Sequence, residues 1–306
     1  MACIGLIGLG VIGTPLAHLL YKCQKENFVL LTDEQHARAI NKSTIYINKE
    51  SFEPKVVIHR EELCQPIDVL FLCVKNYSLG NTCEYLKEVI TDNTVLVPLQ
   101  NGIYANDYIK KQFPNNVVLE GFAQGPNTMR VANGFVYQNP GVYHIGTSDA
   151  SSMACAERVC NLLKSIGIQC FFDSDIKHAI WKKMMLNVAG NASTALTGID
   201  YCMIKNSGEM QAICRSIMEE FCLIAQRSGI TISEKDIEDV LQYFITYNEA
   251  KHTSMLEDVL HRRQTENSFL AGYMVKISEE YGLSVPHIET IYLLMKIKED
   301  VYLDRL

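Results

Sequence analysis

A short apolar segment beyond the middle of the chain carries three polar side chains at helical spacing. Lys183, Asn187 and Asn191 recur every four residues in the segment 181–191, whose other members are mostly apolar. On an α-helix this spacing aligns the three along one face, about 6 Å apart per step. Polar groups in a buried stripe need partners, so the pattern predicts either a polar ligand or a structural lysine–asparagine network. Lys182 lies about 100° away around such a helix and is the poorer candidate.

A lysine in this position suits the reduction of a ketone. Hydride arriving at a carbonyl carbon leaves negative charge on the oxygen, which an ammonium group can polarise and then protonate. The two asparagines could hold the oxygens of a substrate and position Lys183. We therefore expect Lys183 to be catalytic, and we expect a hydride donor to bind elsewhere on the chain.

A glycine-rich turn near the N-terminus predicts where that donor binds. Six residues that follow the apolar run 2–7 form the pattern GxGxxG: Gly8, Leu9, Gly10, Val11, Ile12 and Gly13. The first glycine permits a tight turn, the second lets the backbone approach a pyrophosphate, and the third lets helix and strand pack closely. The following helix offers N–H groups and partial positive charge to the phosphates. The alternative is a glycine turn with a structural role only.

Asp33 bears on the identity of the dinucleotide. It ends the second apolar run, 20 residues after Gly13, where an acid that binds the ribose is expected. A carboxylate there can accept hydrogen bonds from the ribose hydroxyls of NAD and would repel the 2′-phosphate of NADP. We predict NAD(H), with NADP(H) left open. In the alternative interpretation, Asp33 points to solvent and caps the following helix.

The first half of the chain must supply the elements that hold this turn. Apolar runs alternate there with helical segments, which is typical of a parallel sheet covered on both faces. These runs occupy residues 2–7, 28–32, 55–58, 68–74, 94–99 and 117–122. The segment 135–145 contains Asn139, Pro140 and Gly141, and we expect it to form a hairpin that closes the domain.

The second half differs in composition and in the periodicity of its apolar residues. After about residue 175 glycine and proline become sparse, and apolar residues recur with a helical period. The fold class is therefore α/β, with an N-terminal Rossmann-type doubly wound sheet and a C-terminal all-helical domain. We assign 1–175 to a dinucleotide-binding Rossmann domain and 176–306 to a helical substrate-binding and catalytic domain.

Composition excludes several classes of function. The net charge of −7 and the absence of a basic run argue against nucleic acid as a partner. No apolar run approaches the ~20 residues that span a membrane. The 11 cysteines lack zinc-ligand spacing, so no metal is expected, and their odd number suits a cytoplasmic location. The expected partner is a small molecule, and a homodimer stays open.

Five segments, together with the glycine turn, resemble the ketopantoate reductase (2-dehydropantoate 2-reductase) family nearly end to end. The segment 181–191 is similar to the family's W-x-K-x-x-x-N-x-x-x-N. Four shorter segments are similar to its Val-Lys, QNG, S-S-M-x-x-D and R-x-T-E signatures: 74–75, 100–102, 253–259 and 263–266. The resemblance implies reduction of 2-dehydropantoate to pantoate by hydride transfer from a nicotinamide cofactor, within pantothenate and coenzyme A synthesis.

The resemblance also implies a role for individual side chains. Lys183 would donate the proton to the ketone. Three residues would hold the carboxylate and hydroxyls of the substrate: Asn187, Asn191 and Ser254. Three more would serve the cofactor or the space beside it: Asn101 between nicotinamide and substrate, Lys75 lining the cofactor cleft, and Glu266 reaching the cofactor or the substrate hydroxyl.

The sequence departs from the family in two places that affect function. Many members carry arginine where this chain has Asp33, and Thr253 replaces the first serine of S-S-M. The first difference leaves room for a related NAD-dependent D-2-hydroxyacid (mandelate-type) dehydrogenase that acts on another 2-keto acid. A regulatory protein that senses the dinucleotide is the alternative outside enzymes.

Overall fold

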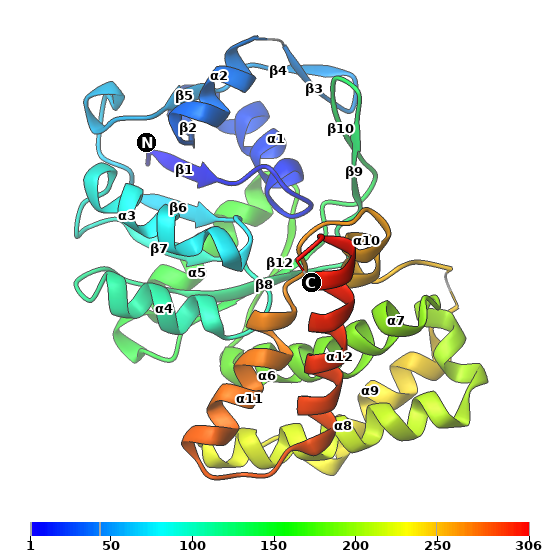
Figure 1. The fold of residues 1–306 in the computed structure, drawn as a ribbon. Helices are drawn as coiled ribbons and strands as arrows, with labels where there is room; N and C mark the ends of the chain where they lie inside the picture. Colours follow the sequence, from blue (N-terminus) through cyan, green and yellow to red (C-terminus); the bar gives the residue numbers. More distant parts are fainter. Residues whose placement is uncertain (1, 43, 249, 306) are drawn as a thin grey trace. The chain divides into compact units, whose positions relative to one another are not determined.

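Five apolar runs of the N-terminal half assemble into one parallel sheet in the computed structural model of the chain (Figure 1). The structure describes residues 2–42, 44–248 and 250–305, without the side chains of residues 35, 39, 41 and 42. The chain divides into two compact units. The first holds the residues up to Asn101 together with Ala105–Lys177, and the second holds Gly102–Tyr104 and the residues from His178 onward.

The parallel sheet of the first unit has the strand order β5-β2-β1-β6-β7. Four of its strands are largely buried, as expected when helices cover both faces. The strands are β1 (Ile4–Ile7), β2 (Phe28–Leu31), β5 (Lys55–Val57), β6 (Val69–Leu72) and β7 (Val95–Pro98). The prediction of a doubly wound α/β sheet is thereby confirmed.

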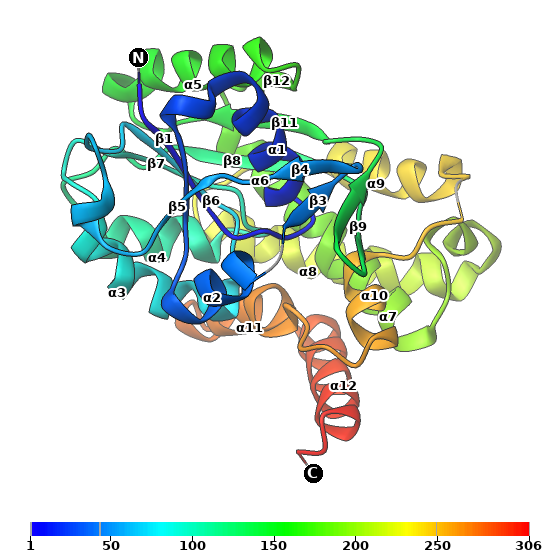
Figure 2. The same cartoon turned by 90° about the horizontal axis from the view of Figure 1, so that it is seen from above.

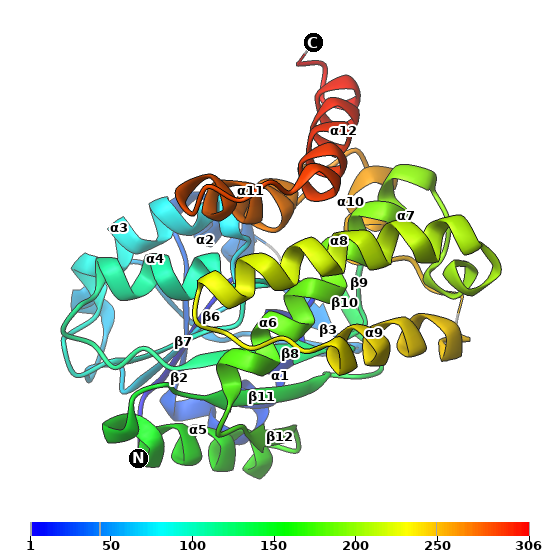
Figure 3. The same ribbon diagram turned by 90° about the horizontal axis from the view of Figure 1, so that it is seen from below.

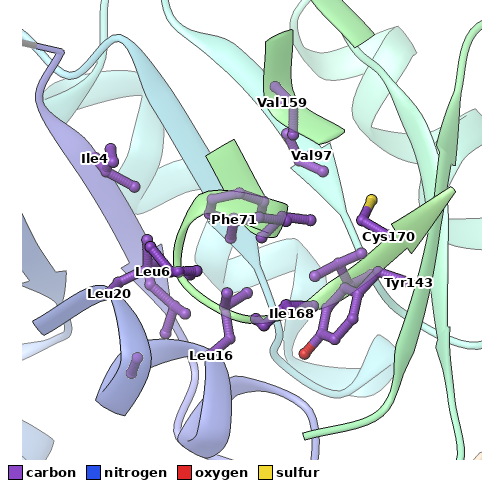
Figure 4. Close-up of a cluster of buried hydrophobic side chains, with 14 of the residues drawn as sticks. Ile4, Leu6, Leu16, Leu20, Phe71, Val97, Tyr143, Val159, Ile168 and Cys170 are labelled. Atoms are coloured by element: carbon purple, nitrogen blue, oxygen red, sulfur yellow. The ribbon is translucent and has the colours of Figure 1, made fainter. Parts of the chain in front are cut away.

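Helices pack on both faces of this sheet. They are α1 (Gly13–Gln24), α2 (Glu34–Lys42), α3 (Leu79–Val89), α4 (Tyr104–Gln112) and α5 (Met153–Ser165). Helix α5 lies on one side of the strands, and α3 and α4 lie on the other (Figures 2 and 3). Ile4 and Leu6 of β1 belong to the same buried cluster as Leu16 and Leu20 of α1 (Figure 4). This packing fixes the helix that begins at the glycine turn against the strand that ends there.

Two smaller sheets complete the first unit. One has the order β4-β3-β10-β9 and the other the order β12-β11-β8. Their strands are β3 (Ile45–Ile47), β4 (Glu50–Phe52), β8 (Glu120–Gln124), β9 (Thr128–Val131), β10 (Gly134–Tyr137), β11 (Val142–Gly146) and β12 (Gln169–Phe172).

The hairpin predicted over 135–145 is wrong. Strand β10 pairs with β9 and β3, whereas β11 pairs with β8 and β12, so the two halves of the segment lie in different sheets. The chain does turn at Gly141, where φ is +91°. The turn residues thus marked a change of direction correctly, but local turn chemistry does not determine which strands pair.

The predicted sixth strand of the parallel sheet, 117–122, is only partly right. Leu96 of β7 exchanges backbone hydrogen bonds with Val117 and Leu119, at 2.9 Å each. The chain then leaves that edge and continues as β8 in the smaller sheet with β11 and β12. The sixth run therefore begins beside the parallel sheet and ends in another one.

The second unit is helical, as predicted. It contains most of α6 (Ile176–Leu186), a π-helical segment Asn187–Asn191 that we call the π-turn, α7 (Ala192–Thr197), α8 (Gly208–Arg227), α9 (Glu234–Thr246), α10 (Ser254–Leu260), α11 (Ala271–Glu280) and α12 (Pro286–Tyr302). Helices α8 and α9 run side by side (Figure 3). Helix α7 packs against α10 and α12, which brings the end of the π-turn close to the start of α10. Within the described ranges, none of the helices has both the length and the apolarity to cross a membrane.

Candidate active site

The glycine turn and three other predicted cofactor residues follow strands of the parallel sheet. The glycine turn follows β1, Asp33 follows β2, Lys75 follows β6 and Asn101 follows β7. The carboxyl ends of parallel strands lie at one edge of the sheet. The strand order reverses between β1 and β6, and ligands of such sheets bind outside the carboxyl ends at this reversal. The fold of the first unit therefore gathers these residues at the edge where a ligand is expected.

The three glycines of the turn differ in backbone conformation and in the space that a Cβ would have. Gly8 has a φ of +102°, and a Cβ there would lie 2.7 Å from the backbone carbon of Cys73. A Cβ on Gly13 would lie 1.9 Å from the carbonyl oxygen of Gly8. Among the described residues, and apart from its neighbours in the chain, a Cβ on Gly10 would meet no atom within 4 Å. The protein's own packing thus requires glycine at positions 8 and 13, whereas the open space beside Gly10 fits a ligand that approaches the backbone.

The start of α1 is suited to an anion. In the described structure no side chain caps the helix and its first turn contains no acidic residue. Its early N–H groups and its partial positive charge are therefore available to a phosphate. Leu9 and Ile12 anchor the turn by packing on the core, while Val11 is 52% exposed. The residues present fit the pyrophosphate of a dinucleotide.

Asp33 caps the helix that follows it. Its Oδ1 accepts a hydrogen bond of 2.8 Å from the backbone N–H of His36, and both carboxylate oxygens lie within 2.9 Å of His36 Nδ1. A carboxylate has about four lone-pair sites, so a helix cap and a ribose hydroxyl are compatible roles for such a group. The alternative interpretation of Asp33 as an exposed cap therefore describes a real contact, and it does not exclude the ribose.

The ends of β6 and β7 are joined by an asparagine that the sequence analysis did not single out. Asn76 is buried, and its amide nitrogen donates a 3.1 Å hydrogen bond to the carbonyl oxygen of Asn101. Lys75 and Asn101 are both half-buried and thus partly open to solvent. The sequence shows only that an asparagine directly follows a strand-end lysine; the burial that makes its amide need a partner appears in the folded chain.

In the second unit the lysine and the two asparagines are not on a uniform α-helix. Lys183 lies near the end of α6, while Asn187 and Asn191 are the first and last residues of the π-turn. The expectation of a continuous α-helical stripe is therefore wrong from residue 187 onward. The two asparagines nevertheless meet, because Asn191 Nδ2 donates a 3.2 Å hydrogen bond to Asn187 Oδ1. Such π-turns interrupt α-helices rarely and often at functional sites.

The environment of Lys183 makes its ammonium a weaker base than an exposed lysine. Burial lowers the pKa of Lys183 to about 8, and the negative charge of Glu266 opposes this shift. Glu266 is itself 6% exposed and precedes a short helical turn at Asn267–Phe269. A lysine with a pKa near neutrality can release a proton to a substrate and recover it from water, as general acid catalysis requires.

Lys182, which the sequence made the poorer candidate, is engaged in ion pairs. Its ammonium lies 2.6 Å from Asp239 and 3.0 Å from Asp236, both on α9. These pairs raise the pKa of Lys182 despite its partial burial, so the two adjacent lysines have opposite shifts. Lys182 therefore joins α6 to α9 through two ion pairs.

Ser254 is placed beside the π-turn by its neighbour. Thr253 caps α10 by accepting a 3.2 Å hydrogen bond from the N–H of Leu256, and its hydroxyl lies 3.0 Å from that of Thr194. Thr194 in turn contacts the carbonyl oxygens of Gly190 and Asn191. Ser254 is the exposed first residue of α10. The second unit thus collects the π-turn asparagines and the start of α10 in one region.

A parallel sheet with a glycine turn at its reversal point is typical of domains that bind a dinucleotide, and the first unit of the chain has this architecture. Two family models match it: ketopantoate reductase PanE/ApbA over residues 4–150, and its C-terminal model over residues 175–299. Together they cover most of the sequence. The chain belongs to the ketopantoate reductase family.

Individual relatives and solved structures are similar to this chain over nearly their whole length. The 2-dehydropantoate 2-reductase of Streptococcus pyogenes is 24% identical over 308 residues, which cover 97% of each protein. A structure of D-mandelate dehydrogenase with NADH and anilino(oxo)acetate superposes with a TM-score of 0.86 at 19% identity, over 98% of this chain and 99% of the other. The dimeric ketopantoate reductase of Staphylococcus aureus superposes with a TM-score of 0.78 at 20% identity, over 98% and 99%.

Proposed function

We propose that the protein reduces 2-dehydropantoate to pantoate, with a nicotinamide cofactor as the source of hydride. The observation that carries the proposal is the arrangement in the second unit, where Asn187 and Asn191 contact each other at 3.2 Å and Lys183 lies in the field of Glu266. Burial also lowers the pKa of Lys183 to about 8. Membership of the ketopantoate reductase family supports the choice of substrate.

In the proposed reaction, each of the site residues has a separate role. A bound nicotinamide cofactor supplies the hydride. Lys183 polarises the ketone oxygen and donates its proton as negative charge develops there. Asn187 accepts from Asn191 through its oxygen, so its amide nitrogen remains a donor suited to a substrate carboxylate. Ser254 adds a hydroxyl beside these amides. The negative charge of Glu266 raises the pKa of Lys183, so the lysine stays protonated up to a higher pH than burial alone would allow.

A second candidate is an NAD-dependent D-2-hydroxyacid dehydrogenase that acts on a different 2-keto acid. Asp33 favours it, because an acid after β2 suits NAD, and the related D-mandelate dehydrogenase is described with NADH. Steady-state kinetics with a panel of 2-keto acids, each with NADH and NADPH, decide between the two. The proposal requires the highest kcat/KM for 2-dehydropantoate. A higher value for an aryl 2-keto acid would select the second candidate, and no turnover of any member would reject both.

We predict that the unaltered protein binds NADH more tightly than NADPH, and that Asp33→Arg reverses this preference. The substitution removes a charge that repels the 2′-phosphate and adds one that pairs with it. Each effect should change the ratio of the two dissociation constants by about tenfold or more. Titration of the protein with each reduced cofactor, followed by nicotinamide fluorescence, measures the ratio.

Asp33→Asn is the matched control, because asparagine also caps helices well and so preserves the start of α2. It should abolish most of the discrimination without creating a preference for NADPH. Tighter binding of NADPH by the unaltered protein would show that Asp33 does not select the cofactor.

The pH dependence of kcat/KM should report Lys183. A protonated donor is present below its pKa and lost above it, so kcat/KM for the keto acid should fall as pH rises through about 8. Glu266→Gln removes the charge that opposes the lowering of this pKa, so the fall should move to lower pH. The exposed acid Glu289 of α12 provides the control, and Glu289→Gln should leave the profile in place. A profile that does not move in Glu266→Gln would separate Glu266 from the proton donor.

We also propose that the chain forms a homodimer, as the related Staphylococcus aureus enzyme is described to do. Helix α12 supports this with four large apolar side chains that are about half exposed: Leu293, Leu294, Ile297 and Val301. Light scattering of the purified protein measures its mass against the 34.6 kDa of one chain.

A further inference from the structure

A chain of hydroxyl groups runs from the start of α10 to the backbone of the π-turn. The N–H of Leu256 donates to Thr253 Oγ1 at 3.2 Å, and Thr253 Oγ1 lies 3.0 Å from Thr194 Oγ1. Thr194 Oγ1 lies 2.9 Å from the carbonyl oxygen of Gly190 and 3.1 Å from that of Asn191. Both threonines are buried, with Thr194 fully enclosed, so these contacts do not compete with solvent.

The direction of the hydrogen bonds follows from the number of protons. Carbonyl oxygens only accept, so the single proton of Thr194 must serve them. Thr253 then donates its own proton to Thr194 and accepts from the N–H of Leu256. Each hydroxyl or N–H proton in this series of hydrogen bonds is thus donated to an acceptor. The order is therefore Leu256 N–H, Thr253, Thr194 and the π-turn carbonyls.

The Thr194 hydroxyl acts where the helix changes its hydrogen-bond pattern. The backbone bonds of a π-turn span one residue more than those of an α-helix, and α7 resumes the α pattern at Ala192. Carbonyl groups at such a junction need donors, because unpaired buried backbone groups are costly. Thr194 supplies a donor to Asn191 itself and to the residue before it. It thereby holds the backbone from which the Asn191 side chain reaches Asn187.

We propose that Thr194 and Thr253 are positioning residues for substrate binding: their hydroxyl pair fixes the π-turn and joins it to the helix that begins with Ser254. The inference rests on the proposed function, since it concerns the same region of the second unit. Neither threonine is assigned a contact with the substrate. Their effect passes through the orientation of Asn187 and Asn191 and through the placement of Ser254.

The test compares two valine substitutions in one helix. Thr194→Val keeps the shape of the side chain and removes its hydroxyl. Thr197→Val is the matched control, because Thr197 makes the same kind of bond, at 2.8 Å to the carbonyl oxygen of Ser193, outside the π-turn. We expect Thr194→Val to raise KM for the 2-keto acid by about tenfold or more, as the loss of one well-placed amide contact would. Thr197→Val should leave KM within about twofold of the unaltered value.

Further measurements separate positioning from general stability. Thermal unfolding followed by circular dichroism should show similar losses for the two valine variants, and the dissociation constant of the reduced cofactor should stay unchanged in both. Thr194→Ser retains the hydroxyl and should restore KM. If Thr194→Val does not fold, Thr253→Val removes the other hydroxyl of the pair and should also raise KM. Thr253→Ser retains the hydroxyl and should leave KM near the unaltered value.

The outcomes distinguish the inference from the function on which it rests. If the unaltered protein turns over no 2-keto acid, the proposed function fails and the inference fails with it. If the unaltered protein is active and both valine variants lower the unfolding temperature with KM unchanged, the threonines are structural and the inference alone is overturned. A raised KM that serine restores supports it.

Discussion

Replacement of Lys183 by alanine should lower kcat/KM for 2-keto acid reduction by about a hundredfold to ten-thousandfold, the usual contribution of a positioned general acid. The ammonium is the group that can both polarise the ketone oxygen and protonate it, and its pKa of about 8 allows the transfer near neutral pH. Steady-state kinetics measure the loss. The dissociation constant of the reduced cofactor should change little, because the glycine turn belongs to the other unit.

Lys182→Ala is the control for this prediction. Lys182 is adjacent in sequence and carries the same charge, but it is held by Asp236 and Asp239. Its removal should lower the stability of the second unit modestly and leave kcat near the unaltered value. Full turnover by Lys183→Ala would remove this lysine from the mechanism. That result, combined with tight cofactor binding, would favour a regulatory protein that senses the dinucleotide.

The glycine turn and the parallel sheet could be predicted because their signals are local. A strand buried on both faces is a continuous apolar run, and GxGxxG specifies a backbone shape through the residues themselves. The strands of the sheet β4-β3-β10-β9 are only three or four residues long, and β3 pairs with β10 across more than 80 residues of chain. Such short strands carry little periodicity, and their pairing depends on contacts that no local pattern specifies.

In the candidate site, too, features set by neighbouring residues could be predicted, whereas features set by residues distant in sequence could not. The spacing of Lys183, Asn187 and Asn191 indicated that they belong together, and the two asparagines do contact each other. The π-turn was not predicted from the sequence, and the hydroxyl pair that we propose holds it joins Thr194 and Thr253, which are 59 residues apart in sequence. The lowered pKa of Lys183 could not be predicted either, because its burial and its proximity to Glu266 exist only in the folded chain.

Gly10→Ala should weaken the binding of both NADH and NADPH by about tenfold or more while leaving the fold intact. Apart from Gly10 itself and its two neighbours in the chain, no atom of the described residues lies within 4 Å of the position that the new methyl group would take, and Gly10 has no positive φ that a side chain would strain. If glycine is needed there, the reason must be a ligand that approaches the backbone, which is the role of the second glycine for a pyrophosphate. Fluorescence titration gives the two dissociation constants, and thermal unfolding should show an unchanged or slightly raised midpoint.

Two further glycines make the Gly10 result interpretable. A Cβ on Gly208, at the start of α8, also meets no atom within 4 Å, so Gly208→Ala should change neither stability nor cofactor binding. A Cβ on Gly13 would lie 1.9 Å from the carbonyl oxygen of Gly8, so Gly13→Ala should destabilise the first unit and lose binding with its fold. Only a ligand at the turn predicts a stable Gly10→Ala protein that binds poorly. Unchanged dissociation constants in that protein would mean that the dinucleotide does not approach the backbone at position 10.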